Sequence, residues 1–272
     1  MKQENASISV VVRTRDVESY FPELLRSLAL QTLKPSELVI VDNYSTKKEA
    51  EKLKKVLEFA RKSFFNNALP IKLVLIADKD FSHAFSTNAG VSVSSSELVC
   101  ITNGHSLPSS RSWLESGARH FRNQLVAGVG GYTTPHKNGT FWEKLFYGWT
   151  WRKLNEKSKR YMSDSYFSTT NCLLRRALWE KYPFDESLSD IIMCEPKFGG
   201  EDYDWSREML ARGYEIVVEP KFCVYHSHGE NLPTLFSKYS VWREIRKRIG
   251  LLERPRKSFT RLNSANLDWV SV

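Results

Sequence analysis

The first 120 residues alternate short apolar runs with longer polar-faced segments, and this alternation restricts the fold more than any other feature. The apolar runs are typical of buried strands and occupy residues 8–12, 37–41, 71–77 and 97–101. The segments between and after them favour helices over residues 19–31, 46–63, 84–94 and 108–121. Four strand–helix units in succession predict right-handed crossovers and a parallel sheet.

Polar loops follow three of the predicted strands: RTRD at residues 13–16, DNYST at 42–46 and TNGHS at 102–106. Because ligands of open parallel sheets bind beyond the carboxyl ends of the strands, these loops are expected to line a site. The first half therefore resembles a nucleotide-binding unit. It contains neither a GxGxxG turn nor a Walker A lysine loop, which disfavours a dinucleotide enzyme and a P-loop NTPase.

After about residue 129 the pattern changes. Residues 132–164 mix aromatic and basic side chains without a clean strand, and a helical flap, an acceptor-binding insert and an oligomer contact all remain open for them. Beyond them we predict strands at 166–174, 215–218 and 222–225, a short helix near Trp179, a helix ending at Gly213 and a basic helix at 233–250.

The chain shows no internal repeat and no low-complexity linker. We therefore predict one domain over residues 1–230, followed by a C-terminal helix and tail over residues 231–272. The domain divides into a nucleotide-binding half, residues 1–125, and an acceptor and base half, residues 126–230.

The net charge of +9 is concentrated near the C-terminus. Residues 243–261 hold eight Lys or Arg and two Glu, and so contribute +6 of it. Such a segment is compatible with phosphate, nucleic acid, an anionic membrane or a solvated helix face, although no DNA- or RNA-binding motif supports nucleic acid. Trp242, Ile245, Ile249 and Leu252 recur at helical spacing, which fits either a membrane-facing helix or a helix packed on the core.

The cysteines and the N-terminus indicate a reducing compartment. Cys100, Cys172, Cys194 and Cys223 form no CxxC pair, which excludes an evident zinc site or disulfide framework. The N-terminus has no signal pattern, and no apolar run approaches the ~18 residues of a membrane span. We expect a cytoplasmic protein that is at most attached to the inner membrane face.

The stretch FGGEDYDW at residues 198–205 is the strongest candidate for chemistry. Two glycines precede three acids, and SREMLARG continues as a helix that ends at Gly213. Glu201 and Asp202 are thus expected at a helix N-terminus, where the dipole favours an ionised carboxylate that can accept a proton. The alternative is an acidic first turn that only caps the helix.

Five stretches, in the same order, resemble family 2 glycosyltransferases, which have the GT-A fold. They are ISVVVRTRD, LVIVDNYST, FSHAFSTNAGVSVSSSELVCITNGHSLP, TTNCLLRRALWEKYPFDESL and GGEDYDWSREMLARGYEIVVEP, and together they cover roughly residues 7–228. The resemblance implies a GT-A (Rossmann-like) α/β fold with a mixed, mostly parallel sheet, here with a basic helical appendage at the C-terminus. It also implies inverting transfer of a sugar from a nucleotide-sugar donor to an acceptor hydroxyl.

The resemblance assigns roles residue by residue. Asp202 matches the family's catalytic base, and Glu201 lies beside it. Asp42 matches the acid that contacts the base or ribose of the nucleotide. Thr14 and Arg15 match the loop around the nucleobase and phosphates, and Asn88 lies near the sugar side.

The family's metal motif, Asp-x-Asp, is replaced here by Asn103-Gly104-His105. His105 matches a metal-ligand position, while Asn103 offers a weaker, neutral oxygen on the nucleotide-sugar side. His226 or His228 matches a third ligand, and both point to one side of an extended backbone. Imidazole ligands favour Mn²⁺ over Mg²⁺. Without a metal, Arg13, Arg15 or His228 would have to neutralise the leaving diphosphate.

The implied enzyme is a hexosyl- or deoxyhexosyltransferase of cell-surface polysaccharide or glycoconjugate synthesis. Its donor would carry UDP, GDP or dTDP, and its acceptor would be a glycan or a lipid-linked sugar, without nucleic acid. The alternative is a catalytically degenerate GT-A protein that binds nucleotide or glycan as a scaffold. The missing Asp-x-Asp motivates that alternative, and the intact FGGEDYDW opposes it. A nucleotide-sugar synthase is disfavoured because RTRDVESY lacks glycine.

Overall fold

A computed structural model describes residues 6–153, 159–161, 167–195, 199–262 and 267–272. The described strands form one sheet in the order β10-β3-β2-β1-β4-β8-β6-β9-β5, and β7 pairs with β9. Their bounds are β1 Ile8–Thr14, β2 Glu37–Asp42, β3 Ile71–Leu75, β4 Leu98–Asn103, β5 Leu107–Pro108, β6 Val126–Thr134, β7 Lys159–Tyr161, β8 Asn171–Arg175, β9 Glu215–Tyr225 and β10 Trp269–Ser271.

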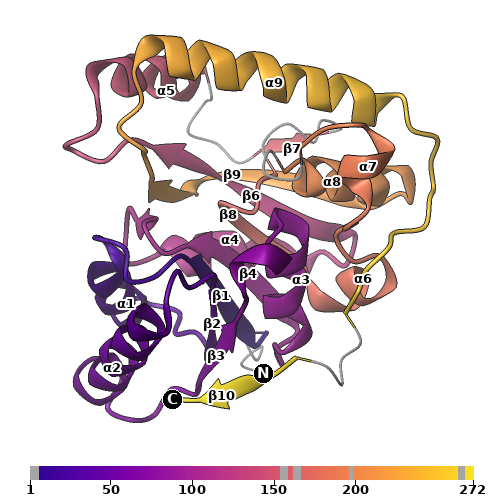
Figure 1. The fold of residues 1–272 in the computed structure, drawn as a ribbon. Coiled ribbons are helices and arrows are strands. Elements are labelled where there is room, and N and C mark those ends of the chain that lie inside the picture. Colours follow the sequence, from indigo (N-terminus) through magenta and orange to yellow (C-terminus); the bar gives the residue numbers. More distant parts are fainter. Residues whose placement is uncertain (1–5, 154–158, 162–166, 196–198, 263–266) are drawn as a thin grey trace.

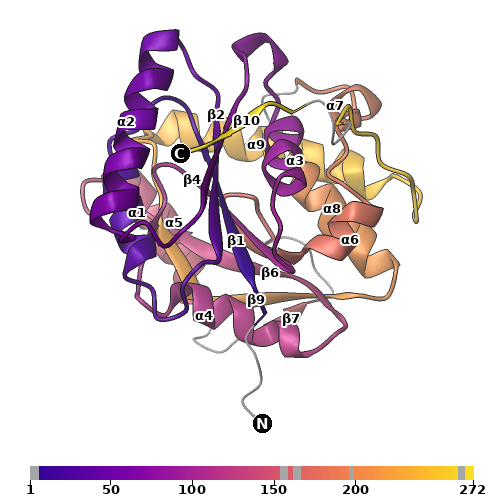
Figure 2. The same ribbon diagram turned by 90° about the horizontal axis from the view of Figure 1, so that it is seen from below.

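Helices cover both faces of this sheet (Figures 1 and 2). Their bounds are α1 Phe21–Ala29, α2 Lys47–Ser63, α3 His83–Ser92, α4 Trp113–Ala118, α5 Phe141–Lys153, α6 Arg176–Lys181, α7 Leu188–Ile191, α8 Glu201–Ala211 and α9 Leu232–Gly250. The described residues also include the short 3₁₀ turns η1 at Asp78–Asp80 and η2 at Arg119–Arg122.

The alternation of side chains along β1 divides the core into two layers. Val10 and Val12 pack toward α1, α2 and α4, while Val11 packs toward α3, α6 and α8. Both sets are fully buried, as expected of a strand covered on both faces. Apart from Ser9, whose hydroxyl donates to Glu37 (2.5 Å), the strand is apolar until Arg13, where the site begins.

The four predicted strand–helix units are present. β1 pairs in parallel with β2 and β4, and β2 pairs in parallel with β3. This register places Thr14 opposite Asp42 and Arg13 opposite Asn103, so the polar loops that follow the strands meet at one sheet edge. The mixed sheet, with antiparallel β8 between β4 and β6, agrees with the expected fold class.

The second half differs in detail from the sequence prediction. Residues 132–164 contain the end of β6, helix α5 and strand β7. The two strands predicted at 215–218 and 222–225 are one strand, β9, and the helix predicted from Pro108 begins later, at Trp113. Phe198 of the FGGEDYDW stretch lies outside the described residues.

The C-terminal residues return to the domain. α5 and α9 lie side by side at one end of the molecule, and the chain then runs past α8 to reach β3 (Figure 1). There β10 pairs with β3 in antiparallel fashion. Within the residues that the structure describes, no helix combines the length and the apolarity needed to cross a bilayer.

Candidate active site

Asp42 anchors the nucleotide end of the predicted site. Its side chain is fully buried, and Oδ1 accepts a hydrogen bond from the Asp16 amide (2.8 Å). Asp16 has a left-handed backbone (φ 58°), and its own Oδ1 accepts from the Ser45 amide (2.8 Å). These two carboxylates tie the loops after β1 and β2 together. Burial, followed by the nearby charge of Asp16, raises the pKa of Asp42 to about 7.

Thr14 and Arg15 lie in the loop after β1, where the sequence places them. The Thr14 hydroxyl donates to Glu18 Oε1 (2.9 Å), whereas the Arg15 guanidinium is largely exposed, 3.5 Å from Asp78. Arg15 is thus available to a ligand at the carboxyl ends of the parallel strands. Contact of either residue with a nucleotide remains a prediction.

Arg13 is the centre of the polar network and was considered at the sequence level only as a diphosphate partner. Its guanidinium donates to Thr87 Oγ1 (2.9 Å), Asn103 Oδ1 (3.1 Å) and Thr169 O (3.1 Å). It also lies 4.0 Å from Glu201 Oε1, and its side chain is only 10% exposed. Arg13 therefore joins three strand ends to the acidic helix.

Glu201 and Asp202 occupy the first turn of α8, as predicted. Gly200 caps the helix with φ 104°, a conformation that favours glycine. Thr169 holds both acids, because its hydroxyl donates to Glu201 Oε1 (3.0 Å) and its amide donates to Asp202 Oδ2 (3.2 Å). The Tyr203 amide donates to Asp202 Oδ1 (2.7 Å).

The two carboxyl groups differ in environment. Glu201 is 3% exposed, and burial, followed by the charge of Asp202, raises its pKa to about 7. Asp202 is partly exposed and accepts two backbone hydrogen bonds, which fix the direction of its carboxyl group. Asp202 is therefore the carboxylate that a substrate hydroxyl can reach.

His105, His226 and His228 converge, and their candidate ligand atoms lie within 4.8 Å of one another. The Nε2 atoms of His226 and His228 are 3.0 Å apart, and His226 Nδ1 lies 3.0 Å from Ser106 Oγ. His105 Nδ1 pairs with Glu18, while its Nε2 is buried without a partner. Burial, followed by the charge of His105, lowers the pKa of His226 and His228, which keeps their rings neutral.

Residues of the insert position this histidine cluster. The buried carboxylate of Glu143 on α5 accepts from the amides of His228 (2.9 Å) and Glu230 (3.1 Å). His136 donates from Nε2 to the His105 carbonyl (2.9 Å). The role of residues 132–164 that the sequence left open thus includes holding the loop after β9.

Two residues that were predicted to contact the nucleotide-sugar donor, Asn88 and Asn103, form hydrogen bonds within the protein. Asn88 is fully buried, its Nδ2 donates to Phe184 O and Glu186 Oε1 (2.8 Å each), and its Oδ1 accepts from Trp179 (2.8 Å). Asn103 Oδ1 accepts from Arg13 (3.1 Å). Their roles toward a sugar remain predictions, and the geometry gives both residues a structural task as well.

The acidic pair and the histidine cluster flank the same strand end. Thr169 and Arg13 link Glu201 to Asn103, and His105 follows two residues later. The two acids of α8, the three imidazoles and the buried acid at the end of β2 thus lie around the carboxyl ends of the parallel strands. Sequence reasoning missed Glu18, Thr169 and the structural role of Arg13.

The sequence is similar to those of known proteins. Residues 9–182 match the family model described as Glycosyl transferase family 2. The O-antigen chain rhamnosyltransferase RfbN of Salmonella typhimurium is 24% identical over 235 residues, which cover 85% of this chain and 70% of that protein.

Solved structures share the fold at low sequence identity. The mannosyltransferase PcManGT from Pyrobaculum calidifontis, in complex with GDP-Man and Mn²⁺, matches with a TM-score of 0.65 and 16% identity, over 93% of this chain and 67% of that one. TarS of S. aureus with UDP-GlcNAc matches with a TM-score of 0.56 and 18% identity, over 95% and 68% of the two chains. Glucosyl-3-phosphoglycerate synthase from Mycobacterium tuberculosis, with Mn²⁺, UDP-Glc and phosphoglyceric acid, matches at 0.54 and 13%, over 92% and 81%. These likenesses confirm the predicted fold class.

Proposed function

This chain belongs to glycosyl transferase family 2, and we propose that it transfers a sugar from a nucleotide-sugar donor to an acceptor hydroxyl with inversion at the anomeric carbon. The observation that carries the proposal is the accessible Asp202 carboxylate in the first turn of α8. It lies beside a buried Glu201 and near the strand ends at which nucleotides bind in sheets of this kind.

Asp202 acts as the general base. The acceptor hydroxyl oxygen attacks the anomeric carbon, its proton passes to Asp202, and the bond between that carbon and the diphosphate oxygen breaks. Thr169 and Tyr203 hold the carboxylate from their backbone amides, which fixes its direction. Burial raises the pKa of Glu201, which accepts a hydrogen bond from the Thr169 hydroxyl. Through Thr169, Glu201 helps to position Asp202 from the buried side.

The histidine cluster fits a divalent cation. Burial lowers the pKa of His226 and His228, which favours the neutral rings that can bind a metal. His105 Nε2 has no protein partner, and Glu18 contacts the opposite nitrogen of that ring. His105, His226 and His228 would hold the ion, which when bound neutralises charge on the leaving diphosphate. Two of the similar structures contain Mn²⁺, and imidazole ligands favour Mn²⁺ over Mg²⁺.

The donor is proposed to be a UDP-, GDP- or dTDP-linked hexose or deoxyhexose. The similarity to an O-antigen chain rhamnosyltransferase supports a glycan or lipid-linked acceptor and a role in cell-surface polysaccharide synthesis. Residues 1–125 are proposed to bind the nucleotide and residues 126–230 to supply the base and the acceptor side. Residues 231–272 follow them as the C-terminal segment.

A membrane-facing surface is a second part of this proposal. Phe236 and Tyr239 on α9, with Phe141 on α5, expose between 50% and 68% of their surface. Trp242 and Arg243 line a shallow groove on the same helix. Aromatic and basic side chains together suit an anionic bilayer, and α5 begins next to the histidine cluster. Sedimentation with anionic vesicles supports this contact, and recovery in the supernatant overturns it.

The decisive experiment substitutes Asp202→Asn. General-base catalysis contributes typically ~10² to 10⁴-fold, so turnover should fall by about that factor. Binding of UDP, GDP or dTDP, titrated calorimetrically with Mn²⁺, Mg²⁺ or EDTA, should stay within about twofold of the unsubstituted protein. Asp190→Asn, at an exposed position on α7, serves as the control. Near-normal turnover of the Asp202 variant contradicts the assignment. Nucleotide binding without turnover in the unsubstituted protein favours the scaffold alternative.

A further inference from the structure

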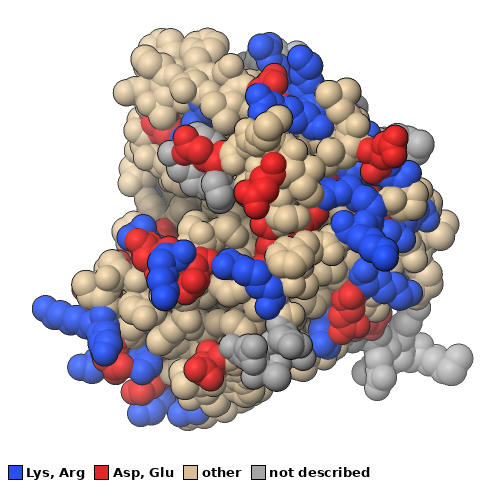
Figure 3. Space-filling model, turned by 45° about the vertical axis from the view of Figure 1, so that its right-hand side comes forward, with Lys and Arg blue, Asp and Glu red and all other residues tan. Residues whose placement is uncertain are grey.

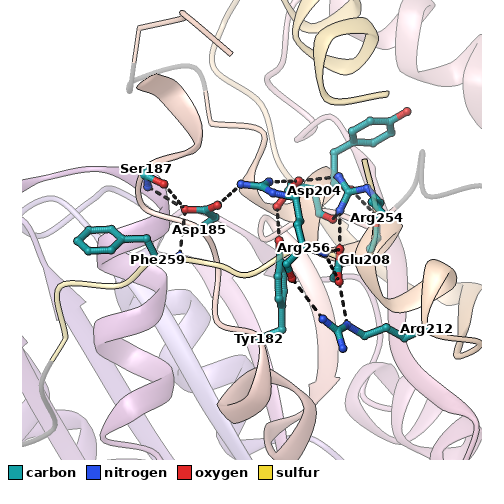
Figure 4. Close-up of polar contacts among 11 residues, drawn as sticks. Tyr182, Asp185, Ser187, Asp204, Glu208, Arg212, Arg254, Arg256 and Phe259 are labelled. Carbon is teal, nitrogen blue, oxygen red and sulfur yellow. Dashed lines mark hydrogen bonds and ion pairs between the residues drawn. The ribbon is translucent and has the colours of Figure 1, made fainter. Parts of the chain in front are cut away.

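A buried ionic cluster lies behind the acidic helix α8, on the side away from Thr169. Its acids are Asp204 and Glu208 of α8, whose side chains are 0% exposed. Arg212, just after α8, pairs with Glu208 (2.8 Å). The other two cations, Arg254 and Arg256, come from the segment 254–261 that follows α9, which we call the C-terminal strap. Figure 4 shows Arg254 and Arg256 of the strap directed onto these two carboxylates.

Arg254 binds α8 at three points. Its Nη2 donates to Asp204 Oδ1 (2.6 Å), and its Nη1 lies within hydrogen-bond distance of Asp204 O (3.1 Å) and Glu208 Oε2 (3.0 Å). The main-chain carbonyl that it contacts belongs to the first turn of the helix, two residues beyond Asp202. Because one guanidinium holds both a main-chain and a side-chain oxygen of Asp204, it restricts sliding and rotation of that turn.

Arg256 extends the contact to a second element. Its Nη1 donates to Asp204 Oδ1 (2.8 Å), and its backbone amide donates to Glu208 Oε1 (3.0 Å). Its guanidinium also pairs with Asp185, which is 1% exposed and lies in the turn after α6. Arg256 thus joins α8 to that turn.

The strap then reaches the donor side of the sheet. The Glu186 amide donates to Phe259 O (2.9 Å), and the Thr260 hydroxyl donates to Glu186 Oε1 (2.6 Å). The same Glu186 oxygen accepts from Asn88 on α3 (2.8 Å). α3 also carries Thr87, which accepts from Arg13 (2.9 Å).

Two routes therefore connect the donor half to α8. The front route runs from Arg13 through Thr169 to Glu201 and Asp202. The back route runs from Asn88 through Glu186 and the strap to Asp204. Both end within the first turn of α8, so they hold this turn from opposite sides.

The basic excess of the C-terminal sequence is thus used partly inside the molecule. Of the cations that the sequence placed in one basic segment, Arg254 and Arg256 are 7% and 14% exposed and paired with buried acids. Figure 3, which brings this side of the molecule forward, shows Lys and Arg gathered beside Asp and Glu. Burying several charges is costly compared with apolar packing, while directional bonds define a geometry.

We propose that the C-terminal strap is a positioning element of the transfer reaction: Arg254 and Arg256 hold the first turn of α8 so that Asp202 faces the acceptor hydroxyl. Neither arginine touches a reacting atom in this scheme. The inference rests on the proposed function for its effect on turnover. The expected restriction of motion in the first turn of α8 does not depend on that function.

The test compares Arg256→Lys and Arg256→Ala with Lys257→Ala. Lysine keeps the charge and loses the planar fork, while Lys257 is an exposed cation at the next position along the strap. Misplacement of a catalytic group by about 1 Å costs about 10²-fold in rate. We expect turnover to fall roughly 10- to 100-fold in Arg256→Ala and less in Arg256→Lys, with nucleoside diphosphate affinity within about twofold. Lys257→Ala should match the unsubstituted protein.

Amide hydrogen exchange provides the readout that is independent of activity. Exchange at residues 203–206 should quicken by about tenfold or more in Arg256→Ala, with β1 unchanged. Turnover within twofold, or nucleotide affinity lost in parallel with turnover, overturns the proposal. If no donor supports turnover in the unsubstituted protein, the proposed function fails. In that case the rate of amide exchange in α8 still tests whether the strap holds this helix, and an unchanged rate in Arg256→Ala overturns that role. If Arg256→Ala does not fold, the same measurements of turnover, nucleotide affinity and amide exchange are made on Arg256→Lys.

Discussion

Asp42 places a carboxyl group where its charge opposes folding. Oδ2 is buried without a partner, and the pKa is raised from 3.8 to about 7. Between these two values the folded chain binds the proton and the unfolded chain does not, so stability falls as pH rises. At about 1.4 kcal/mol per pH unit, the loss between pH 5 and pH 8 reaches up to about 3 kcal/mol.

The substitution Asp42→Asn should therefore remove this part of the pH dependence. When the pH is raised from 5 to 8, the free energy of unfolding of the variant should increase relative to that of the unsubstituted protein by up to about 3 kcal/mol, because the Asn side chain does not ionise. Urea unfolding at both pH values measures the difference. Asp190→Asn, at an exposed position, should leave the pH profile unchanged. Equal profiles for all three proteins would contradict the burial argument for Asp42.

Glu18 is a second residue with a specific expected effect. It pairs with His105 Nδ1 and so directs the free Nε2 toward the other two imidazoles. Loss of such an outer carboxylate typically costs about 10- to 100-fold in metal affinity. Glu18→Gln should weaken Mn²⁺ binding by about that factor, measured by titration without nucleotide. Glu23→Gln, at an exposed position on α1, is the control, and unchanged affinity in Glu18→Gln would refute the role.

For single residues, the sequence predicts a role where that role follows from neighbouring residues in the chain. Glu201 and Asp202 were placed in a helix's first turn because two glycines and three acids precede a helical run. Thr169 and Glu18 were not identified, since each acts through a partner 32 or 87 residues away. Nothing in a single chain marks an ordinary Thr or Glu as the partner of a distant side chain.

At the scale of elements, the N-terminus of α8 is packed against α9. Gly200 has φ 104°, and a Cβ there would lie 3.0 Å from Ile245 Cγ2 and 3.1 Å from Ile249 Cδ1. Gly213, beyond the other end of the helix, has φ 83° and open space around it. Alanine at Gly213 meets only the backbone cost of about 1–2 kcal/mol, whereas alanine at Gly200 must also displace α9.

We therefore expect Gly200→Ala to be more destabilising than Gly213→Ala by about 1 kcal/mol or more. The free energy of unfolding in urea measures both variants against the unsubstituted protein. Because both positions have positive φ, their difference isolates the packing of α9 on the start of α8. Equal losses would show that α9 yields freely at this contact.

The elements also show where sequence reasoning reaches its limit. Strands β1 to β4 were predicted because each is composed mainly of β-branched or apolar residues. β6 was missed because it contains Gly128, Gly130 and Gly131, which weaken a strand pattern. Gly128 lies under the ring of Phe167 and Gly131 against the Phe222 carbonyl, so distant packing requires these glycines. A local pattern does not reveal that requirement.

At the scale of the whole molecule, the C-terminal residues complete the sheet. β10 covers the edge of β3, with Trp269 opposite Val74 and Ser271 opposite Lys72. The Val272 amide continues this ladder by donating to Ile71 O (3.0 Å). An exposed strand edge is a template for pairing with another chain, so this cover also limits association.

Removal of residues 267–272 should expose that edge and produce concentration-dependent association. Ile71, Leu73 and Val74 are buried, and their strand would lose its antiparallel neighbour. Light scattering after size-exclusion chromatography, over a concentration series, measures the effect. Nucleotide binding should persist, because the predicted site lies at the ends of β1, β2 and β4, away from this edge. Val270→Lys keeps the backbone pairing and adds a charge at an exposed position, so it should remain monodisperse. A truncated chain that stays monodisperse over the same range would show that β3 does not need its cover.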